Sequence, residues 1–288
     1  MQITKSKLVI AVVLCFAAGG LFFYFFFPKK APPQPAPVEV VGPRVEVIGK
    51  SVEGRNIEAY TYGNGDKNLV FVGGIHGGYE WNSVVLAYQM IDYFNANPKL
   101  IPENISLVII PALNPDGVFK VVGKEGKFTA ADVTQTKEQS APGRFNANAV
   151  DLNRNFDCKW QPESIWQSKK VSAGTSVFSE PEAAAFRDFV AKVKPEAVVL
   201  WHSQAGAVYA SQCENGLATS TRILMETYAQ AGGYPAIPTF DAYVVTGAAE
   251  DWLASINIPA ITVELKTHEG IEFNENLAGV KAVVEKYR

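Results

Sequence analysis

The chain has 288 residues, of which 48% are hydrophobic and 19% are charged. This composition is ordinary for a globular protein, leaves room for a large core and argues against disorder. The formal net charge is −3, but the first thirty residues carry four lysines and no acids, so the rest of the chain carries about −7. Because such a surface repels nucleic acid, we expect no nucleic-acid partner.

A long apolar stretch comes first in the chain. Residues 8–27 are all apolar or small, enough to span a bilayer as one helix after a short N-terminal segment, residues 1–7. The alternative is a cleaved signal peptide that ends near the small residues Ala17 to Gly20. The apolar run continues through Phe27, which favours an uncleaved membrane anchor. Lysines flank the stretch on both sides, so the charges leave its orientation open.

Residues 28–43 form a proline-rich segment with six prolines. Such a segment is either an extended, semi-rigid linker or disordered, and both interpretations place a soluble domain at residues 44–288. That domain contains two cysteines, Cys158 and Cys213, which form a disulfide in an oxidising compartment or remain thiols in a reducing one. Since a membrane anchor usually delivers its domain outwards, we expect the disulfide and an extracytoplasmic location for the domain.

Strand and helix patterns alternate along this domain, which predicts a single α/β domain with a mixed, mostly parallel central sheet covered by helices on both faces. A long segment, residues 119–176, has few regular signals, and we expect it to shape a binding site. The predicted strands are Ile57–Tyr62, Asn68–Val72, Ser106–Ile110, Ala197–Trp201 and Ala260–Leu265, and the predicted helices are Trp81–Phe94, Glu180–Val193 with Ser179 as N-cap, Ser220–Ala231 and Asn274–Tyr287.

Three reactive side chains lie at the ends of predicted strands. His76 lies four residues after the second strand, His202 directly follows the fourth, and Glu264 is near the end of the fifth. Open α/β sheets bind ligands outside the carboxyl ends of their strands, so these side chains are candidates for one site. Glu264 is flanked by Val263 and Leu265, where an unpaired carboxylate is costly to bury unless it faces a site or the sheet's edge.

The two histidines, His76 and His202, fit a metal site together with one nearby acid. His76 and the nearby Glu80, with the distant His202, would supply the three protein ligands of a catalytic zinc. The alternative makes His76 a loop residue and Glu80 an acid that complements the dipole of the helix. Neighbouring glycines favour the metal, because they let the backbone bend beside a ligand. His268, on a predicted loop, is expected at the surface.

At this point a resemblance becomes specific. Six segments occur in an order that is similar to the zinc carboxypeptidase family of carboxypeptidases A and B, over roughly residues 44–288. The resemblance implies one zinc ion per chain, held by His76, Glu80 and His202. The family usually has two residues between the first two ligands, whereas three separate His76 from Glu80 here. The segments are GGIHGGYEWN (73–82), NPDG (114–117), DLNRNF (151–156), WHS (201–203), EDW (250–252) and TVEL (262–265).

The resemblance also implies the catalytic groups. Glu264 matches the glutamate that takes a proton from water and passes it to the leaving amine. Arg144 is the candidate for stabilising the developing oxyanion, and the alternative is a surface arginine. Tyr243, eight residues before Asp251, fits the family's mobile active-site tyrosine, which caps the bound substrate and assists the reaction. On its own Tyr243 would be read as a core aromatic.

Further residues are implied for binding the substrate. Asn153 and Arg154 match the pair that holds a terminal carboxylate, for which a planar guanidinium is suited. The alternative is an ion pair of Arg154 with Asp151. Glu250 is at the position that lies at the base of the pocket for the leaving residue, and an acid there suits a basic or diamino side chain. Its alternative is an ordinary acid in the first turn of a helix.

The expected function is a zinc metallocarboxypeptidase of the bacterial envelope type, bound to the membrane by its N-terminal helix. It would hydrolyse the C-terminal residue of a peptide, with the stem peptides of peptidoglycan as candidate substrates. Two alternatives remain open. One is a zinc-dependent deacylase of N-acyl amino acids, whose substrates also carry a carboxylate. The other is an inactive carboxypeptidase-like binding protein, for which the altered spacing of His76 and Glu80 is the argument.

Overall fold

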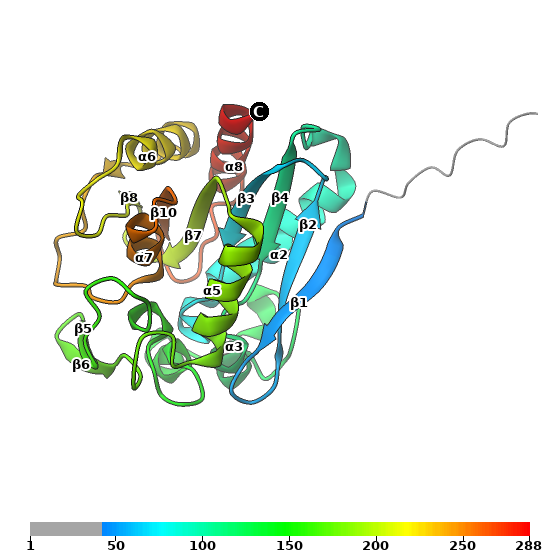
Figure 1. Cartoon of the computed structure of the whole chain (residues 1–288). Coiled ribbons are helices and arrows are strands. Elements are labelled where there is room, and N and C mark those ends of the chain that lie inside the picture. The colour runs from blue at the N-terminus through cyan, green and yellow to red at the C-terminus, as the bar shows by residue number, and fades with distance from the viewer. Residues whose placement is uncertain (1–41) are drawn as a thin grey trace, which may run out of the picture. The chain divides into compact units, whose positions relative to one another are not determined.

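The structure, a computed structural model, describes residues 42–288 (Figure 1). The predicted membrane anchor, residues 8–27, and residues 28–41 of the predicted linker lie outside the described residues, and both stay predictions. Among residues 42–288, no helix is both long enough and apolar enough to cross a membrane.

Eight strands form the central sheet, in the order β1-β2-β4-β3-β7-β10-β8-β9. The four inner strands β4, β3, β7 and β10 are parallel, whereas β1, β2 and β8 pair antiparallel to their inner neighbours. The predicted α/β class with a mixed, mostly parallel sheet is confirmed. The strands are β1 (Arg44–Lys50), β2 (Asn56–Tyr62), β3 (Lys67–Val72), β4 (Ile105–Ile110), β5 (Glu163–Trp166), β6 (Lys169–Ser172), β7 (Ala197–Ser203), β8 (Val208–Ala210), β9 (Ala236–Ile237) and β10 (Ala260–Leu265), with β5 and β6 forming a separate hairpin.

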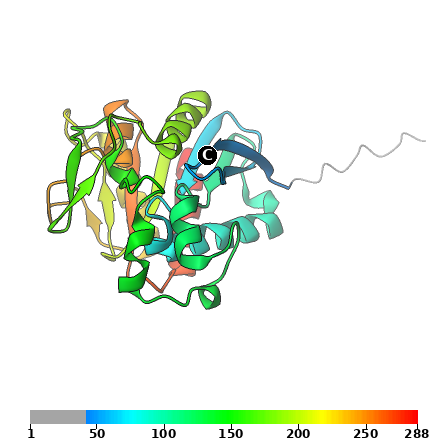
Figure 2. The same ribbon diagram turned by 90° about the horizontal axis from the view of Figure 1, so that it is seen from below.

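Helices cover both faces of the sheet. One apolar cluster joins the sheet to α2, α6 and α8, and a second joins the opposite face to α5 and α7, as the two ribbon views show (Figures 1 and 2). The inner strands are buried on both faces, which explains their continuous apolar runs. The helical elements are η1 (Gly77–Glu80), α2 (Trp81–Ala96), η2 (Pro98–Leu100), α3 (Pro115–Val122), η3 (Ala130–Asp132), α4 (Lys137–Ser140), η4 (Ala141–Arg144), η5 (Leu152–Arg154), α5 (Pro181–Val193), α6 (Thr219–Gly232), α7 (Ala249–Ser255) and α8 (Phe273–Tyr287), where η marks a 3-10 helix.

The predicted core strands and long helices are all present, with ends shifted by at most two residues. The prediction of Ser179 as the N-cap of α5 is wrong, because the cap is Glu180 and Pro181 begins the helix. The Ser179 hydroxyl instead donates to the Glu180 carboxylate at 2.9 Å. Sequence patterns missed strand β1, the β5–β6 hairpin, the short strands β8 and β9, and helices α3 and α7.

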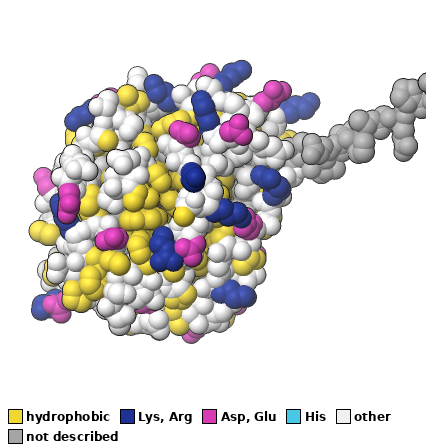
Figure 3. All heavy atoms as spheres, viewed as in Figure 1, with side chains coloured by type: hydrophobic (Ala, Val, Ile, Leu, Met, Phe, Trp, Pro, Cys, Tyr) yellow, Lys and Arg dark blue, Asp and Glu magenta, His cyan; other side chains and the backbone are white. Residues whose placement is uncertain are grey.

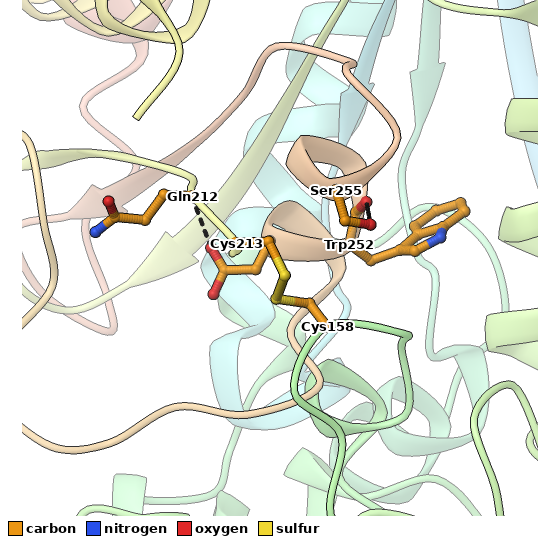
Figure 4. Close-up of a disulfide and its surroundings, with 6 residues drawn as sticks. Cys158, Gln212, Cys213, Trp252 and Ser255 are labelled. Atoms are coloured by element: carbon orange, nitrogen blue, oxygen red, sulfur yellow. Dashed lines mark hydrogen bonds between the residues drawn. A yellow bond between two sulfur atoms is a disulfide. The ribbon is translucent and has the colours of Figure 1, made fainter. Parts of the chain in front are cut away.

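A disulfide joins Cys158 to Cys213, with 6.1 Å between their Cα atoms. Cys158 lies shortly after η5, and Cys213 follows β8. Figure 4 shows the bridge beside α7, close to Trp252, and the backbone amide of Gln212 bonds to the carboxylate of Asp251 there at 3.0 Å. The bridge therefore ties the irregular segment to the sheet next to α7, and the predicted pairing is confirmed.

Candidate active site

The three predicted metal ligands converge at the carboxyl ends of two neighbouring strands. His76 follows β3, His202 is the next-to-last residue of β7, and these strands pair in parallel. One ligand atom from each of His76, Glu80 and His202 lies within 4.8 Å of the others, and all three residues are buried. Nδ1 of His202 is 3.2 Å from Oε2 of Glu80. This distance matches a tetrahedral zinc site, in which two ligand atoms with bonds of about 2 Å to the ion are about 3.3 Å apart.

A tight turn absorbs the extra residue between His76 and Glu80. The intervening residues form the 3-10 helix η1, and Glu80 lies at its junction with α2 with non-helical φ and ψ of −115° and 45°. Gly77 has φ +48°, and a Cβ atom there would lie 2.4 Å from the carbonyl oxygen of Gly143. Because only glycine fits so close an approach in that conformation, it allows the compact turn. The altered spacing therefore does not separate the ligands.

Asp151 organises the region behind the ligands. It is fully buried, with Oδ1 3.5 Å from Nδ1 of His76 and Oδ2 accepting a hydrogen bond from Nε of Arg144 at 2.8 Å. Nη1 of Arg144 lies 3.6 Å from Oε1 of Glu80. The alternative ion pair of Arg154 with Asp151 is wrong, because Arg144 is the arginine that binds this carboxylate. Arg144 is also not the alternative surface residue, since it is 3% exposed.

The two histidines differ in their protonation state when no metal is bound. Burial and the positive charge of Arg144 hold the pKa of His76 well below its usual value, so its imidazole is neutral, as a ligand must be. Burial opposes protonation of His202, but the hydrogen bond and charge of Glu80 outweigh it and raise the pKa of His202 to about 9. Nδ1 of His76 and Nε2 of His202 have no hydrogen-bond partner among the described residues. Two imidazoles and a carboxylate fit zinc, and a zinc ion held there would take the place of the His202 proton beside Glu80.

Glu264 lies beside this group. It is opposite His202 in the register of β10 and β7, and it lines the cavity in front of the ligands. Burial, with the negative charge of Glu80, raises the pKa of Glu264 to about 8. The carboxyl group therefore faces the site and not the sheet's edge, and a dication beside it would favour its ionised form.

The cavity has a volume of about 870 Å³, and every predicted site residue lines it. Arg154, 2% exposed, lies in its wall. A guanidinium carries five N–H donors. Nε and Nη2 of Arg154 donate to the carbonyl of Ile165 at 3.2 and 3.1 Å, and Nη1 donates to the carbonyl of Asn153 at 2.6 Å. One N–H remains on each terminal nitrogen, and such a pair matches the two oxygens of a carboxylate.

Asn153 joins Arg154 to the start of α7. Its side-chain oxygen accepts the backbone N–H of Ala249 at 2.8 Å, and its amide nitrogen donates to Oε1 of Glu250 at 3.4 Å. Oε2 of Glu250 is buried and has no hydrogen-bond partner among the described residues. Glu250 itself lines the cavity, so its carboxylate lies in the cavity wall. Next to it, burial and the charge of Glu250 raise the pKa of Asp251 to about 7.

Tyr243 lies on the loop between β9 and α7 and also lines the cavity. Its ring packs at 4.9 Å against the ring of Phe240, which belongs to the same loop. Burial raises the pKa of Tyr243, so its hydroxyl is protonated at neutral pH and can donate a hydrogen bond. Tyr243 is therefore a loop residue at the cavity and not the core aromatic of the alternative.

The prediction that His268 is a surface residue is wrong. His268 is 3% exposed and lines the cavity, and no histidine is visible on the face of the molecule in Figure 3. Its Nδ1 lies 3.1 Å from the hydroxyl of Ser203, whose backbone N–H donates to Glu80 at 3.2 Å. The side chain of Asn82 fixes this loop by donating to the carbonyl of Thr267 at 2.7 Å. Polar neighbours of His268 in the sequence gave no signal of this burial.

Sequence reasoning also missed Trp166, on the β5–β6 hairpin. Its ring lies in the cavity wall, with the guanidinium carbon of Arg144 4.5 Å from the ring centroid, and it packs edge-on against Tyr79 at 5.1 Å. The alternation in ESIW and KKVS, separated by Gln167 and Ser168, is the signal that could have found this hairpin.

Comparison with known proteins agrees with this geometry. The sequence model of the zinc carboxypeptidase family matches residues 43–285. Gamma-D-glutamyl-L-diamino acid endopeptidase 1 of Lysinibacillus sphaericus is 26% identical over 76% of this chain and 59% of its own length. Carboxypeptidase B of Helicoverpa zea is 26% identical over 75% of this chain and 55% of its own length. The chain thus spans somewhat more than half the length of these two curated relatives.

A solved structure shares the fold. The murein-tripeptide amidase MpaA from Escherichia coli O157 superposes with a TM-score of 0.60 and 22% sequence identity, over 85% of this chain and 93% of that one. The family match covers all but four of the described residues and includes the three ligands and the cavity that faces them. The protein belongs to the zinc carboxypeptidase family, whose members are peptide hydrolases that use zinc.

Proposed function

We propose that this protein is a zinc-dependent metallocarboxypeptidase that removes a C-terminal residue with a basic or diamino side chain from a peptide. The observation that carries the proposal is that Arg154, with one N–H on each terminal nitrogen unused by residues 42–288, lines the same cavity as the carboxylate of Glu250. A terminal carboxylate and a side-chain ammonium would satisfy these two groups in one bound residue.

The proposed reaction divides the chemistry among four groups. When bound by His76, Glu80 and His202, zinc supplies Lewis acidity that lowers the pKa of water and polarises a carbonyl group. Glu264 would take the proton of the attacking water on its carboxylate and deliver it to the nitrogen of the leaving residue. Arg144 would donate to the oxygen that becomes negative as the tetrahedral carbon forms.

Tyr243 would close over the bound residue from its loop. Its hydroxyl, protonated because burial raises its pKa, would donate to the substrate near the scissile bond. With Arg154 at the other end of the residue, the site would hold a free C-terminus and orient the last peptide bond towards the metal ligands. A chain that continued beyond this residue would leave Arg154 without its carboxylate, which favours an exopeptidase over an endopeptidase.

We further propose peptidoglycan stem peptides in the cell envelope as substrates. Two similarities support this substrate class: the relative from Lysinibacillus sphaericus is named for a diamino acid, and the amidase that shares the fold is named for a murein tripeptide. The disulfide between Cys158 and Cys213 favours an oxidising compartment, and hence an extracytoplasmic domain behind the predicted anchor.

The test is the release of C-terminal residues, measured by mass spectrometry, from matched peptides that end in lysine, arginine, diaminopimelate or phenylalanine. We expect the basic and diamino ends to be removed at least tenfold faster than phenylalanine, and a chelator to abolish release until zinc is restored. Glu250→Ile should reverse the preference, whereas Glu226→Ile, an acid on the distant helix α6, should leave it unchanged. An equal rate for all peptides would refute the role of Glu250.

Two other outcomes would replace the proposal. If N-acyl amino acids are hydrolysed and peptides are not, the protein is a deacylase. If the protein fails to take up one zinc per chain after reconstitution, measured by elemental analysis, it is a binding protein without metal chemistry. The structure removes the argument for the latter, since the turn η1 brings Glu80 to both histidines despite the longer spacing.

A further inference from the structure

Three consecutive residues of β5 each contact a different part of the substrate site. The hydroxyl of Ser164 lies 2.8 Å from that of Thr246, three residues after Tyr243 on the same loop. The carbonyl of Ile165 accepts two hydrogen bonds from Arg154. The ring of Trp166 lies against the guanidinium of Arg144. These contacts join the β5–β6 hairpin to Arg154, to Arg144 and to the loop that carries Tyr243, three of the elements that we propose to contact the substrate.

The hairpin is itself firmly attached. It lies outside the central sheet, but the backbone N–H of Asp151 donates to the carbonyl of Ser172 on β6 at 3.0 Å. Trp166 and Val171, from its two strands, pack with Tyr79 in a small buried cluster. Ser164 is 4% exposed and Trp166 is 8% exposed. The hairpin therefore has few ways to move without breaking buried contacts, as a positioning element requires.

We propose that the β5–β6 hairpin is the positioning element of the active site, with Trp166 orienting Arg144 and Ser164 holding the Tyr243 loop. The inference rests on the proposed carboxypeptidase function. Arg144 has no other cation–π partner among residues 42–288, and the Trp166 ring packs against a guanidinium that also contacts Asp151 and Glu80. A buried cation–π contact is strong enough to select one orientation.

The two residues should act on different kinetic constants. Arg144 would contact an oxygen that is negative only in the transition state, so a loss of its orientation should lower kcat and leave KM unchanged. The Tyr243 loop would contact the bound residue before and during reaction, so a loss of its anchor should raise KM instead. A hairpin that merely contributed to stability would not separate the two constants in this way.

The experiment measures kcat and KM of the full-length zinc enzyme with a peptide that ends in lysine. Trp166→Leu should lower kcat roughly tenfold with KM within twofold, and Trp166→Phe, which keeps an aromatic face, should restore most of the loss. Ser164→Ala should raise KM roughly fivefold and weaken binding of free lysine, measured by calorimetry, by the same factor. Ser164→Thr, which keeps the hydroxyl, should restore both.

Lys170→Ala is the matched control, since Lys170 lies on the same hairpin and contacts the exposed Glu163. The inference is overturned if Trp166→Leu and Ser164→Ala have the kinetic constants of Lys170→Ala, or if both change kcat and KM in the same proportion. These outcomes require a wild-type enzyme that releases lysine. If the wild-type enzyme itself releases no C-terminal residue, the proposed function fails instead.

Discussion

The disulfide between Cys158 and Cys213 should be a large contribution to the stability of the domain. The bridge closes a loop with a sequence separation of 55 residues. In the chain-entropy model, a loop of that size stabilises the folded state by about 4 kcal/mol. A domain of about 250 residues has an unfolding entropy of about 2.1 cal/mol/K per residue, so the loss of the bridge should lower Tm by roughly 8 °C.

The assay is thermal unfolding followed by circular dichroism. Every variant also carries Cys15→Ser, so that a titration of thiols reports only on Cys158 and Cys213. The protein with both Cys158→Ser and Cys213→Ser is compared with its parent. Because the carbonyl of Cys158 also accepts the N–H of Gly247 at 2.8 Å, on the loop that carries Tyr243, KM should rise as well. A shift of Tm below about 2 °C would refute the entropic reasoning. Two free thiols in the native parent would refute the pairing itself.

Three further predictions follow from the site. Glu264→Gln should bind zinc with unchanged stoichiometry and lose roughly 10²- to 10⁴-fold in kcat, and near-normal turnover would contradict its role as the base. Gly77→Ala should lower both Tm and zinc affinity, measured by chelator competition, because its Cβ would clash with the carbonyl of Gly143 at a positive φ; a fully stable variant would mean that the turn can widen. The pKa of Asp251 is raised to about 7 in the folded state, so folding favours its protonated carboxyl. Its contribution to the free energy of unfolding is therefore largest below the pKa of the unfolded carboxyl and falls as pH rises from there towards 7. Asp251→Asn should therefore unfold at a higher temperature than wild type at pH 8 but not at pH 4, and an equal difference at both values would contradict the assigned pKa.

The core of the fold was predictable because its pattern is local. The parallel strands are continuous apolar runs, and the histidines and Glu264 lie at their carboxyl ends, where the topology of an α/β sheet gathers ligands. The edge strand β1 was missed although its first four residues alternate between polar and apolar, and the structure leaves most of its residues exposed. The helix α7 has seven residues, too few for a helical period to stand out.

The residues that surround the predicted site residues and hold them in place were less predictable, because their positions depend on contacts between segments distant in the sequence. His268 is flanked by polar residues, and the contacts that bury it come from distant segments: Asn82, 185 positions from Thr267, holds its loop, and Tyr79 packs against its ring. Trp166 meets Arg144 across a segment with few regular elements. The alternative that paired Arg154 with Asp151 failed for the same reason: Arg144, from another segment, binds this carboxylate, and three of the N–H groups of Arg154 donate to backbone carbonyls instead.

The turn η1 shows that the gap between two ligands in a sequence is set by the backbone path and not by the ion. A search for zinc hydrolases that insists on two intervening residues would discard this chain, although its donor atoms lie together. A pattern that instead admits a third residue, provided that glycines follow the histidine, would retain it. The close approach of Gly77 to Gly143 and the winding of η1 let three intervening residues occupy this turn.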